Sequence, residues 1–407
     1  MTRRLLRPLR WLGWHPGYGL LVLVALLTVG AAAGFVAVAG LPPGWAKGTP
    51  MSDATVAYFS GDYYTARSRF RDKVGAAGGR LEALTIDARG PDGAPLTIDI
   101  GWFGAERPRR VLLHSSGIHG VEGFAGSAIQ LRLLDAVPTL GEDGAIVLVH
   151  FLNPYGGAWL RRVNEENVDL NRNFLAPGEG YAGAPAGYGA LDPLLNPPAP
   201  PTWDFFYGQV VWQIARHGMT TLKQAVAGGQ YEYPRGLFFG GKRLQQGPER
   251  YEGFLRERLG RAGRVIAIDV HTGVGEYGED LLLAEQAELE AARRAFGDRV
   301  TLADPDSSAA YRVRGGYERM LARVFPRASV HFVVQEFGTY SPLHVVYALR
   351  EENRWHHHGG GSLQHRTKRG LVVAFSPDDD AWRRSVLDRG RALLDQAVAA
   401  LGRLDRP

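Results

Sequence analysis

Apolar runs of strand length alternate with helical patterns along this chain of 407 residues, and this alternation limits the fold more than any other feature. A Pro-Asp-Gly turn joins two alternating runs and predicts a hairpin. Strands that alternate with helices predict an α/β fold, with a mixed, largely parallel sheet and helices on both faces. The expected strands are 81–87, 96–103, 110–115, 145–152, 265–270, 281–284 and 331–335, and the expected helices are 57–73, 121–136, 205–216, 285–296, 317–325 and 382–401.

Two segments between these elements are expected to be loops. The stretch 176–201 is rich in Gly, Pro and Ala and is too long for a simple connection, which indicates a lid or an insertion. The segment 355–368 contains three consecutive histidines, His356, His357 and His358, followed by three glycines. Such a tract can recruit metal, but a solvated polar loop is the interpretation we favour.

The composition excludes several classes of site and partner. The chain contains no cysteine, which excludes a disulfide scaffold, an iron–sulfur cluster and a cysteine nucleophile. The net charge is +5, but five basic residues and no acidic residue lie within residues 1–50. The remaining chain carries 42 basic and 42 acidic residues, so we expect no nucleic-acid partner. A metal site in this chain would have to use His, Asp and Glu.

The first fifty residues predict a targeting segment. Four arginines occur in the first ten residues, and an uncharged, mostly apolar run follows at 19–41. We expect a basic cytoplasmic N-terminus at 1–18, a transmembrane anchor at 19–41, a linker at 42–54 and one globular domain at 55–403. The alternative is a signal peptide cleaved near Ala-Val-Ala at 37–39. Either interpretation exports the globular domain.

His119 and Glu122 follow the strand at 110–115, and His271 ends the strand at 265–270. In α/β proteins, sites lie beyond the carboxyl ends of such strands. Two histidines and one carboxylate with an open fourth position are typical of catalytic zinc. Glu122 could instead cap a helix, and His271 could be a hydrogen-bonded structural histidine.

Glu336 ends the strand at 331–335, where a carboxylate can act as a general base or form a salt bridge. The stretch 159–174 is dense in arginine, asparagine and acidic residues, including Arg161, Arg162 and Arg172. An arginine fork matches a carboxylate or a developing oxyanion. A surface ion-pair network could account for one of these arginines but not for the whole pattern.

Together these residues resemble the zinc carboxypeptidase superfamily of the carboxypeptidase A type. The phrases at 119–127 and 167–174, with the opening at 58–67, are similar to a bacterial branch, domain-of-unknown-function family 2817. The resemblance implies that His119, Glu122 and His271 bind one Zn²⁺. It also implies that Glu336 is the general base and then donates a proton to the leaving amine. The domain would then face outward from the bacterial cytoplasmic membrane, or be secreted after signal cleavage.

The same resemblance implies roles for residues of the arginine-rich stretch. Asn171 and Arg172 would hold the terminal carboxylate of the substrate. Arg161 or Arg162 would polarise the scissile carbonyl and stabilise the oxyanion, and the sequence does not say which. Asp169 would orient the imidazole of His119.

The expected activity is zinc-dependent hydrolysis of a C-terminal peptide bond, as in metallocarboxypeptidases. One alternative is a deacylase of N-acyl amino acids, like aspartoacylase and succinylglutamate desuccinylase, and another is an inactive carboxylate-binding module. A substrate-capping tyrosine cannot be assigned from the sequence, because Tyr311, Tyr317 and Tyr340 are all candidates. The expected partners are a peptide or acyl-amino-acid substrate with a free carboxylate, and the membrane through the N-terminal helix.

Overall fold

The computed structural model describes residues 50–304 and 312–403. The predicted anchor or signal peptide at 19–41 and the basic segment at 1–18 lie outside the described residues. Within the described part of the chain, no helix combines the length and the apolar character needed to span a membrane.

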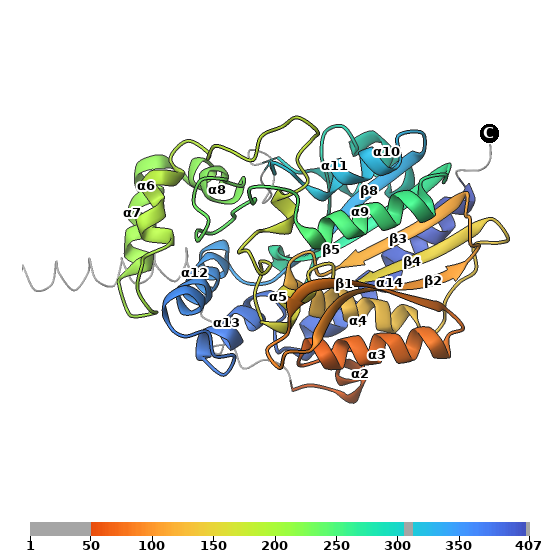
Figure 1. Cartoon of the computed structure of the whole chain (residues 1–407), viewed down its shortest axis with the longest axis horizontal. Helices are drawn as coiled ribbons and strands as arrows, with labels where there is room; N and C mark the ends of the chain where they lie inside the picture. The colour runs from red at the N-terminus through yellow and green to blue at the C-terminus, as the bar shows by residue number, and fades with distance from the viewer. Residues whose placement is uncertain (1–49, 305–311, 404–407) are drawn as a thin grey trace, which may run out of the picture.

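Eight strands form one mixed sheet in the order β1-β2-β4-β3-β5-β8-β6-β7 (Figure 1). The central strands β4, β3, β5 and β8 run parallel to one another. At the flanks, β1, β2 and β4 pair antiparallel, as do β8 and β6. The predicted α/β class with a mixed, largely parallel sheet is confirmed. The strand bounds are β1 Arg80–Arg89, β2 Pro95–Gly104, β3 Arg110–Ser116, β4 Gly144–His150, β5 Arg264–Tyr277, β6 Asp280–Ala284, β7 Val300–Leu302 and β8 Ser329–Gly338.

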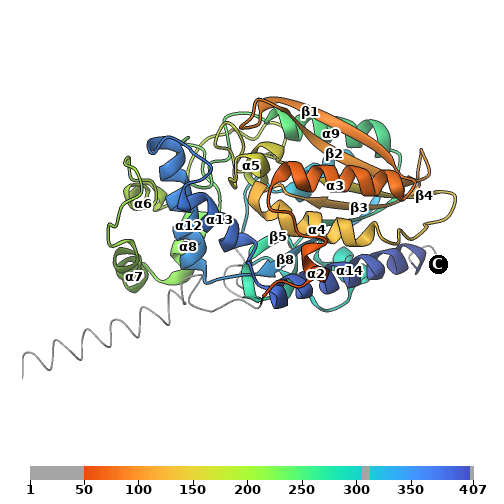
Figure 2. The ribbon, with the colours of Figure 1, turned by 90° about the horizontal axis from the view of Figure 1, so that it is seen from below.

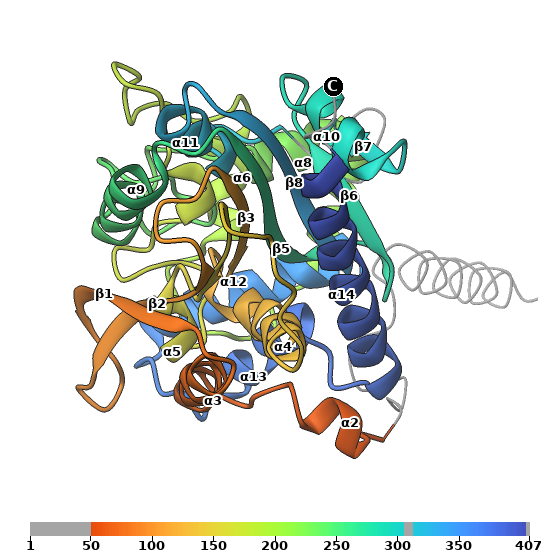
Figure 3. The same ribbon diagram turned by 90° about the vertical axis from the view of Figure 1, so that its right-hand side faces the viewer.

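Helices cover both faces of the sheet (Figure 3). The helices α3, α4, α10 and α14 pack on one face, and α9 and α11 pack on the other. Their bounds are α3 Tyr63–Ala76, α4 Gly123–Leu133, α9 Gln246–Leu259, α10 Leu289–Phe296, α11 Tyr317–Val324 and α14 Asp380–Arg403.

A separate group of helices lies beyond one end of the sheet, at the left in Figures 1 and 2. These are α6 Tyr188–Leu195, α7 Phe206–His217, α8 Met219–Ala227, α12 Pro342–His358 and α13 Arg366–Phe375. Short elements complete the fold, namely α2 Asp53–Val56, α5 Pro154–Ala158 and the 3₁₀ turns η1 Gly120–Glu122 and η2 Leu170–Arg172.

The strand β5 illustrates how the sequence builds two cores. Its residues Ile266, Ile268 and Val270 pack with α4 and α14, while Val265 and Ala267 pack with α9 and α11. Successive side chains of a strand point to opposite faces, and a strand that is covered on both faces reads as one apolar run. This explains why the central strands could be predicted from hydrophobicity alone.

The predicted helix at 57–73 is wrong at its start. The structure has the short α2 before it, and α3 begins only at Tyr63. The side chain of Asp62 accepts a hydrogen bond from the backbone N–H of Thr65 and so caps α3. The spacing of the aromatic residues in this segment suggested one continuous helix and gave no sign of the interruption.

The two expected loops contain helices. α6 lies within 176–201, and the segment 355–368 holds the end of α12 and the start of α13. His356, His357 and His358 form the half-buried last turn of α12, so the predicted solvated loop is wrong there. Most of α12, with α8 and α9, was also not predicted. In α12 the residues 350–354 are charged or polar, and all of them are buried. Helix prediction expects polar residues on the side that faces solvent, so this helix does not show the usual pattern.

Gly120 provides a test of how tightly η1 packs against α5. A Cβ atom at Gly120 would lie 2.0 Å from the carbonyl carbon of Gly156, whereas the exposed Gly253 in α9 has open space around it. We expect Gly120→Ala to lower the free energy of unfolding by about 1–3 kcal/mol through overpacking. Gly253→Ala should raise it by about 0.5–1 kcal/mol, because alanine favours the helix. Urea denaturation measures both, and equal effects of the two substitutions would contradict the packing argument.

Candidate metal centre and active site

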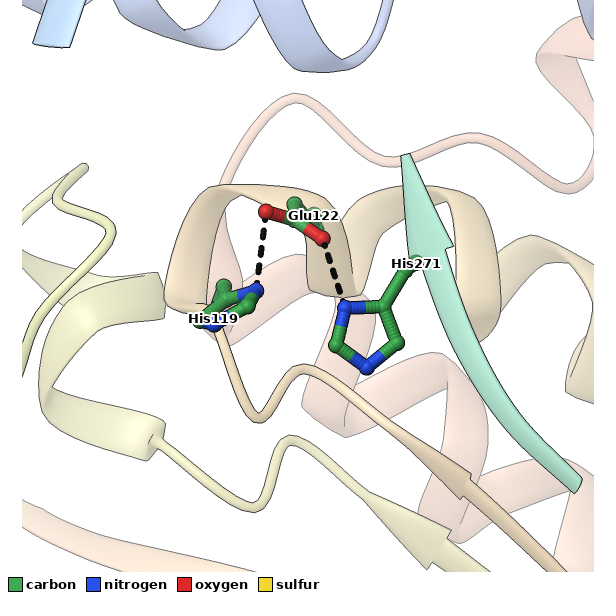
Figure 4. Close-up of side chains that lie close together, drawn as sticks. All are labelled: His119, Glu122 and His271. Carbon is green, nitrogen blue, oxygen red and sulfur yellow. Dashed lines mark ion pairs between the residues drawn. The ribbon is translucent and has the colours of Figure 1, made fainter. Parts of the chain in front are cut away.

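Three predicted ligand residues lie together where β3 ends and its pairing with β5 stops (Figure 4). The chain turns sharply after β3, and His119 and Glu122 stand at the two ends of the first turn of η1. His271 comes from β5, which pairs in parallel with β3 as far as Val270. The predicted end of this strand at residue 270 is wrong, because β5 continues to Tyr277 through its pairing with β8. His119 Nδ1 lies 2.9 Å from Glu122 Oε1, and His271 Nδ1 lies 3.4 Å from Glu122 Oε2. All three side chains are buried.

The sharp turn after β3 depends on Gly117, whose φ is +69°. A Cβ atom there would also lie 2.9 Å from the Cα of Phe151, so both conformation and space require glycine. This turn reverses the chain toward η1. It thereby brings His119 close to His271 in β5, with 4.9 Å between the centroids of the two rings.

The donor set fits a metal ion such as zinc. The buried Nδ1 atom of His119 lies 2.9 Å from Glu122 Oε1, but it makes no hydrogen bond of acceptable geometry with any described residue. Buried polar atoms without partners are rare, and an imidazole nitrogen that faces a carboxylate and another imidazole nitrogen is suited to a cation. Two imidazoles and one carboxylate also leave a fourth coordination position open, as in catalytic zinc sites.

Each candidate ligand histidine is held by its own buried aspartate. His119 Nε2 lies 3.0 Å from Asp169 Oδ1, and His271 Nε2 lies 2.7 Å from Asp269 Oδ2. Such carboxylates orient the ring and direct its other nitrogen to the metal. The predicted position of Asp169 agrees with this arrangement. The same role of Asp269 was not predicted from the sequence, although residues two apart on a strand share a face.

The two adjacent arginines go to different places. Arg162 contacts the candidate metal centre: its Nη1 donates to Glu122 Oε1 at 2.6 Å, and its Nε donates to Asp169 Oδ2 at 3.1 Å. Its Nη2 lies 2.8 Å from His119 Nε2. Arg162 also lines the cavity described below. Of the two arginines, Arg162 is therefore the one that faces the candidate metal centre.

Arg161 instead joins a buried network with α12 and α13. Its Nε donates to Glu352 at 3.1 Å, and its Nη2 donates to Asn167 and Asn353. Lys368 completes the network through Glu352 Oε1 at 2.6 Å. Arg161 is 0% exposed and does not line the cavity. These contacts indicate a structural role for Arg161.

Asn171 and Arg172 also differ in their access to the cavity. Asn171 lines it, and its side-chain oxygen accepts a hydrogen bond from the backbone N–H of Tyr317 at 3.0 Å. Arg172 is fully buried, and its guanidinium donates to the carbonyl oxygens of Ala227 and Asn171. A role for Arg172 in binding the substrate carboxylate would require its side chain to leave these carbonyls.

Glu336 stands directly beside the candidate ligands. It pairs with His271 across β5 and β8, and its Oε1 accepts a hydrogen bond from the backbone N–H of Val274 at 3.0 Å. Burial raises the pKa of Glu336 to about 7, although the charge of His271 works in the opposite direction. A carboxylate with a raised pKa beside a candidate metal centre is suited to general acid–base catalysis.

The pKa values of Glu122 and Asp169 are lowered although both carboxyls are buried. Burial alone would raise the pKa of each carboxyl. The charges of His119 and Arg162 hold the pKa of Glu122 below its usual value. Arg162 and Arg172 do the same for Asp169, whose pKa lies well below its usual value. The arginines thus keep both acids in the form that binds cations or orients imidazoles.

One cavity of about 400 Å³ contains these groups. It is lined by the three candidate ligands, Arg162, Asn171 and Glu336, and by many apolar side chains. Ligand sites in proteins have this size and this mixture of apolar walls with a few polar groups.

The three tyrosines considered for capping the substrate lie in different places. Tyr317 lines the cavity but is buried against Tyr251, and Tyr311 lies outside the described residues. Tyr340 packs against Tyr277 and His344.

Comparisons with known proteins give one family match. A family model described as "Protein of unknown function (DUF2817)" matches residues 59–389. No curated protein matches the sequence. Solved structures with some likeness to the chain include bovine thrombin-activatable fibrinolysis inhibitor in complex with tick carboxypeptidase inhibitor (14% identity, 81% of this chain and 98% of that chain covered, TM-score 0.40), carboxypeptidase A from Helicoverpa armigera (12%, 77% and 73%, 0.40) and murein-tripeptide amidase from Escherichia coli O157 (18%, 70% and 96%, 0.33). Likenesses this distant do not assign an activity to the chain.

The family model spans most of the globular part of the chain, including both phrases that carried the resemblance, 119–127 and 167–174. The protein therefore belongs to the DUF2817 family, as its sequence predicted.

Proposed function

We propose that this protein is a zinc-dependent hydrolase that cleaves an amide bond next to a residue with a free carboxylate. One observation carries the proposal. Two imidazole nitrogens and a carboxylate converge in a cavity, each imidazole is backed by a buried aspartate, and Glu336 stands beside them. This combination is typical of a catalytic rather than a purely structural metal centre.

The residues of the chain divide the chemistry among them. His119, Glu122 and His271 would hold the zinc ion, which would supply Lewis acidity and make water a stronger acid when bound. Glu336 accepts the proton of the attacking water and later gives it to the leaving amine nitrogen. The guanidinium of Arg162 stabilises the negative charge that develops on the carbonyl oxygen.

The substrate carboxylate binds on the polar side of the cavity, at Asn171. Asn171 lines the cavity and offers its amide N–H groups. Arg172 donates to the backbone carbonyl oxygen of Asn171 at 2.9 Å and adds positive charge there. A peptide and an N-acyl amino acid both carry such a carboxylate, so both classes suit this part of the site.

The location of the enzyme is a separate proposal. The apolar run at 19–41 with its preceding arginines would anchor the protein in the cytoplasmic membrane and place the site outside the cytoplasm. Cleavage after 37–39 would secrete it instead. Substrates would then be peptides or acyl-amino acids outside the cytoplasm.

Metal binding can be tested without any substrate. His271→Ala should abolish stoichiometric zinc binding, because it removes one of three ligands. Asp269→Asn should lower zinc affinity about 10–100-fold, because the imidazole loses its orienting partner. Equilibrium dialysis with elemental analysis measures both. His217→Ala, at the exposed end of α7, is the control that should bind zinc like the wild type. Unchanged zinc content in His271→Ala would contradict the assignment.

Glu336→Gln tests the general base. The variant should retain zinc but lose about 10²–10⁴-fold in kcat/KM on a mixed set of peptides and N-acyl amino acids, because no group then takes the proton. The control is Glu276→Gln, an exposed carboxylate near the end of β5. Full activity of zinc-loaded Glu336→Gln would exclude this residue as the base.

The arginine pair allows a separation of catalysis from stability. Arg162→Gln should lower kcat/KM about 10²–10³-fold, as expected when a group that stabilises an oxyanion is removed. Arg161→Gln should lower the free energy of unfolding by about 3–5 kcal/mol, because it leaves a buried ion network incomplete. Its kcat/KM per folded molecule should stay close to that of the wild type. Thermal unfolding and steady-state kinetics on both variants give the comparison, and the reverse pattern would overturn it.

A further inference from the structure

The cavity extends from the candidate metal centre into an apolar arm. The arm is lined by aliphatic side chains from three helices that lie beyond the end of the sheet, α6, α7 and α8. Two valines and two leucines of α12 also line the cavity, namely Val345, Val346, Leu343 and Leu349. The aliphatic residues from the first three helices include Leu191, Leu195, Val210, Ile214, Leu222 and Val226.

The part of the cavity next to β6, β8 and α11 has carboxylates as well as apolar side chains. Its lining includes Tyr317, Glu285 and Glu318 together with Leu283, Phe332 and Val334. Asn171 belongs to this part, because its side chain is hydrogen-bonded to the backbone of Tyr317 at 3.0 Å. A substrate carboxylate held at Asn171 therefore places the amino-acid half of the substrate here. The acyl half lies on the other side of the scissile bond, and a long aliphatic acyl chain is the part of such a substrate that matches the extent of the apolar walls on α6, α7, α8 and α12.

The arm offers little to a peptide. Each residue of a peptide brings one N–H and one C=O group, and each such group loses free energy when buried without a partner. Within the described helices α6, α7 and α8, the polar side chains that line the cavity are Gln213 and Lys223. An aliphatic chain carries no polar group and gains free energy from contact with these walls.

We propose that the arm binds an aliphatic acyl chain, and that the substrates are N-acyl amino acids whose acyl group is several carbons long. This inference rests on the proposed function and specifies its substrate class. Hydrolysis breaks the amide C–N bond and forms a C–O bond between the acyl carbon and the oxygen of water. A proton passes to the amine nitrogen, and the products are a fatty acid and a free amino acid.

The helix α7 forms a wall only one helix thick between the arm and solvent. Val210 and Ile214 line the cavity, whereas the neighbouring Val211 and Trp212 are 38% and 65% exposed. Val210 and Val211 are thus the same residue type in two environments, one lining the cavity and one exposed to solvent. This pair provides a matched test of the arm.

The main experiment is a chain-length series on the zinc-loaded full chain. The substrates are N-acyl alanines with acyl groups of two, six, eight and ten carbons, all below their micelle concentrations. We expect kcat/KM to rise about fourfold per added methylene until the arm is filled, which corresponds to about 0.8 kcal/mol for each buried methylene. Hydrolysis of every member at the same kcat/KM, or preference for the acetyl compound, would overturn the inference and leave the proposed function standing.

The matched variants locate the effect. Val210→Trp should fill part of the arm, so that the longest acyl groups lose at least tenfold in kcat/KM relative to shorter ones. Val211→Trp adds the same side chain on the exposed side and should leave the chain-length profile unchanged. Equal profiles for both variants and the wild type would place the acyl chain elsewhere and overturn the assignment of this arm.

A binding measurement separates the two proposals. Calorimetry on zinc-loaded Glu336→Gln should show N-decanoyl-alanine binding at least a hundredfold more tightly than N-acetyl-alanine. Equal affinities would overturn the inference. If the wild type binds the series in this order but hydrolyses none of its members, the hydrolase proposal fails while the arm stands as an acyl-chain site.

Discussion

A buried carboxylate between two imidazoles and a guanidinium is the interaction on which this site depends. Glu122 is 1% exposed, and an isolated charge at such depth would be strongly unfavourable. His119, His271 and Arg162 surround it, and the backbone N–H of Thr272 donates to its Oε2 at 3.1 Å. These groups meet only if the strands and turns that carry them keep their alignment with one another. The parallel pairing of β3 with β5, and the tight contact of η1 with α5, provide that alignment.

The backbone around the arginine pair explains how two adjacent residues serve different purposes. The carbonyl oxygens of Arg161 and Arg162 accept hydrogen bonds from the N–H groups of Val121 and Gly120. The segment is therefore fixed against η1, and its two side chains leave in different directions. One ion-pairs with Glu352 in α12, and the other with Glu122 and Asp169. The sequence could not distinguish them, because the choice is made by partners far away in the chain.

The central sheet and the positions of the candidate ligands could be predicted from the sequence for a shared physical reason. Buried parallel strands read as continuous apolar runs, and the polar residues that follow them meet at one edge. His119 and Glu122 follow the end of β3. His271 follows the last residue of β5 that pairs with β3, and Glu336 pairs with His271. Most of the helices beyond the sheet were not predicted, because their sequences lack such a clear apolar pattern. Part of α12 buries charged residues in ion pairs, and α6 begins after a left-handed glycine within a stretch rich in Gly and Pro. Tertiary contacts, rather than local periodicity, decide these elements.

The placement of α6, α7 and α8 has a consequence for how enzymes of this architecture could diversify. These helices occupy one continuous stretch of the chain between η2 and β5, and none of the candidate metal ligands found among the described residues belongs to them. Mutations in that stretch can reshape the apolar arm while the strand-end residues keep their positions. Selection can thus act on substrate range and on catalytic chemistry through separate portions of the gene. A library confined to residues 188–227 would be the natural starting point for redirecting such an enzyme in the laboratory.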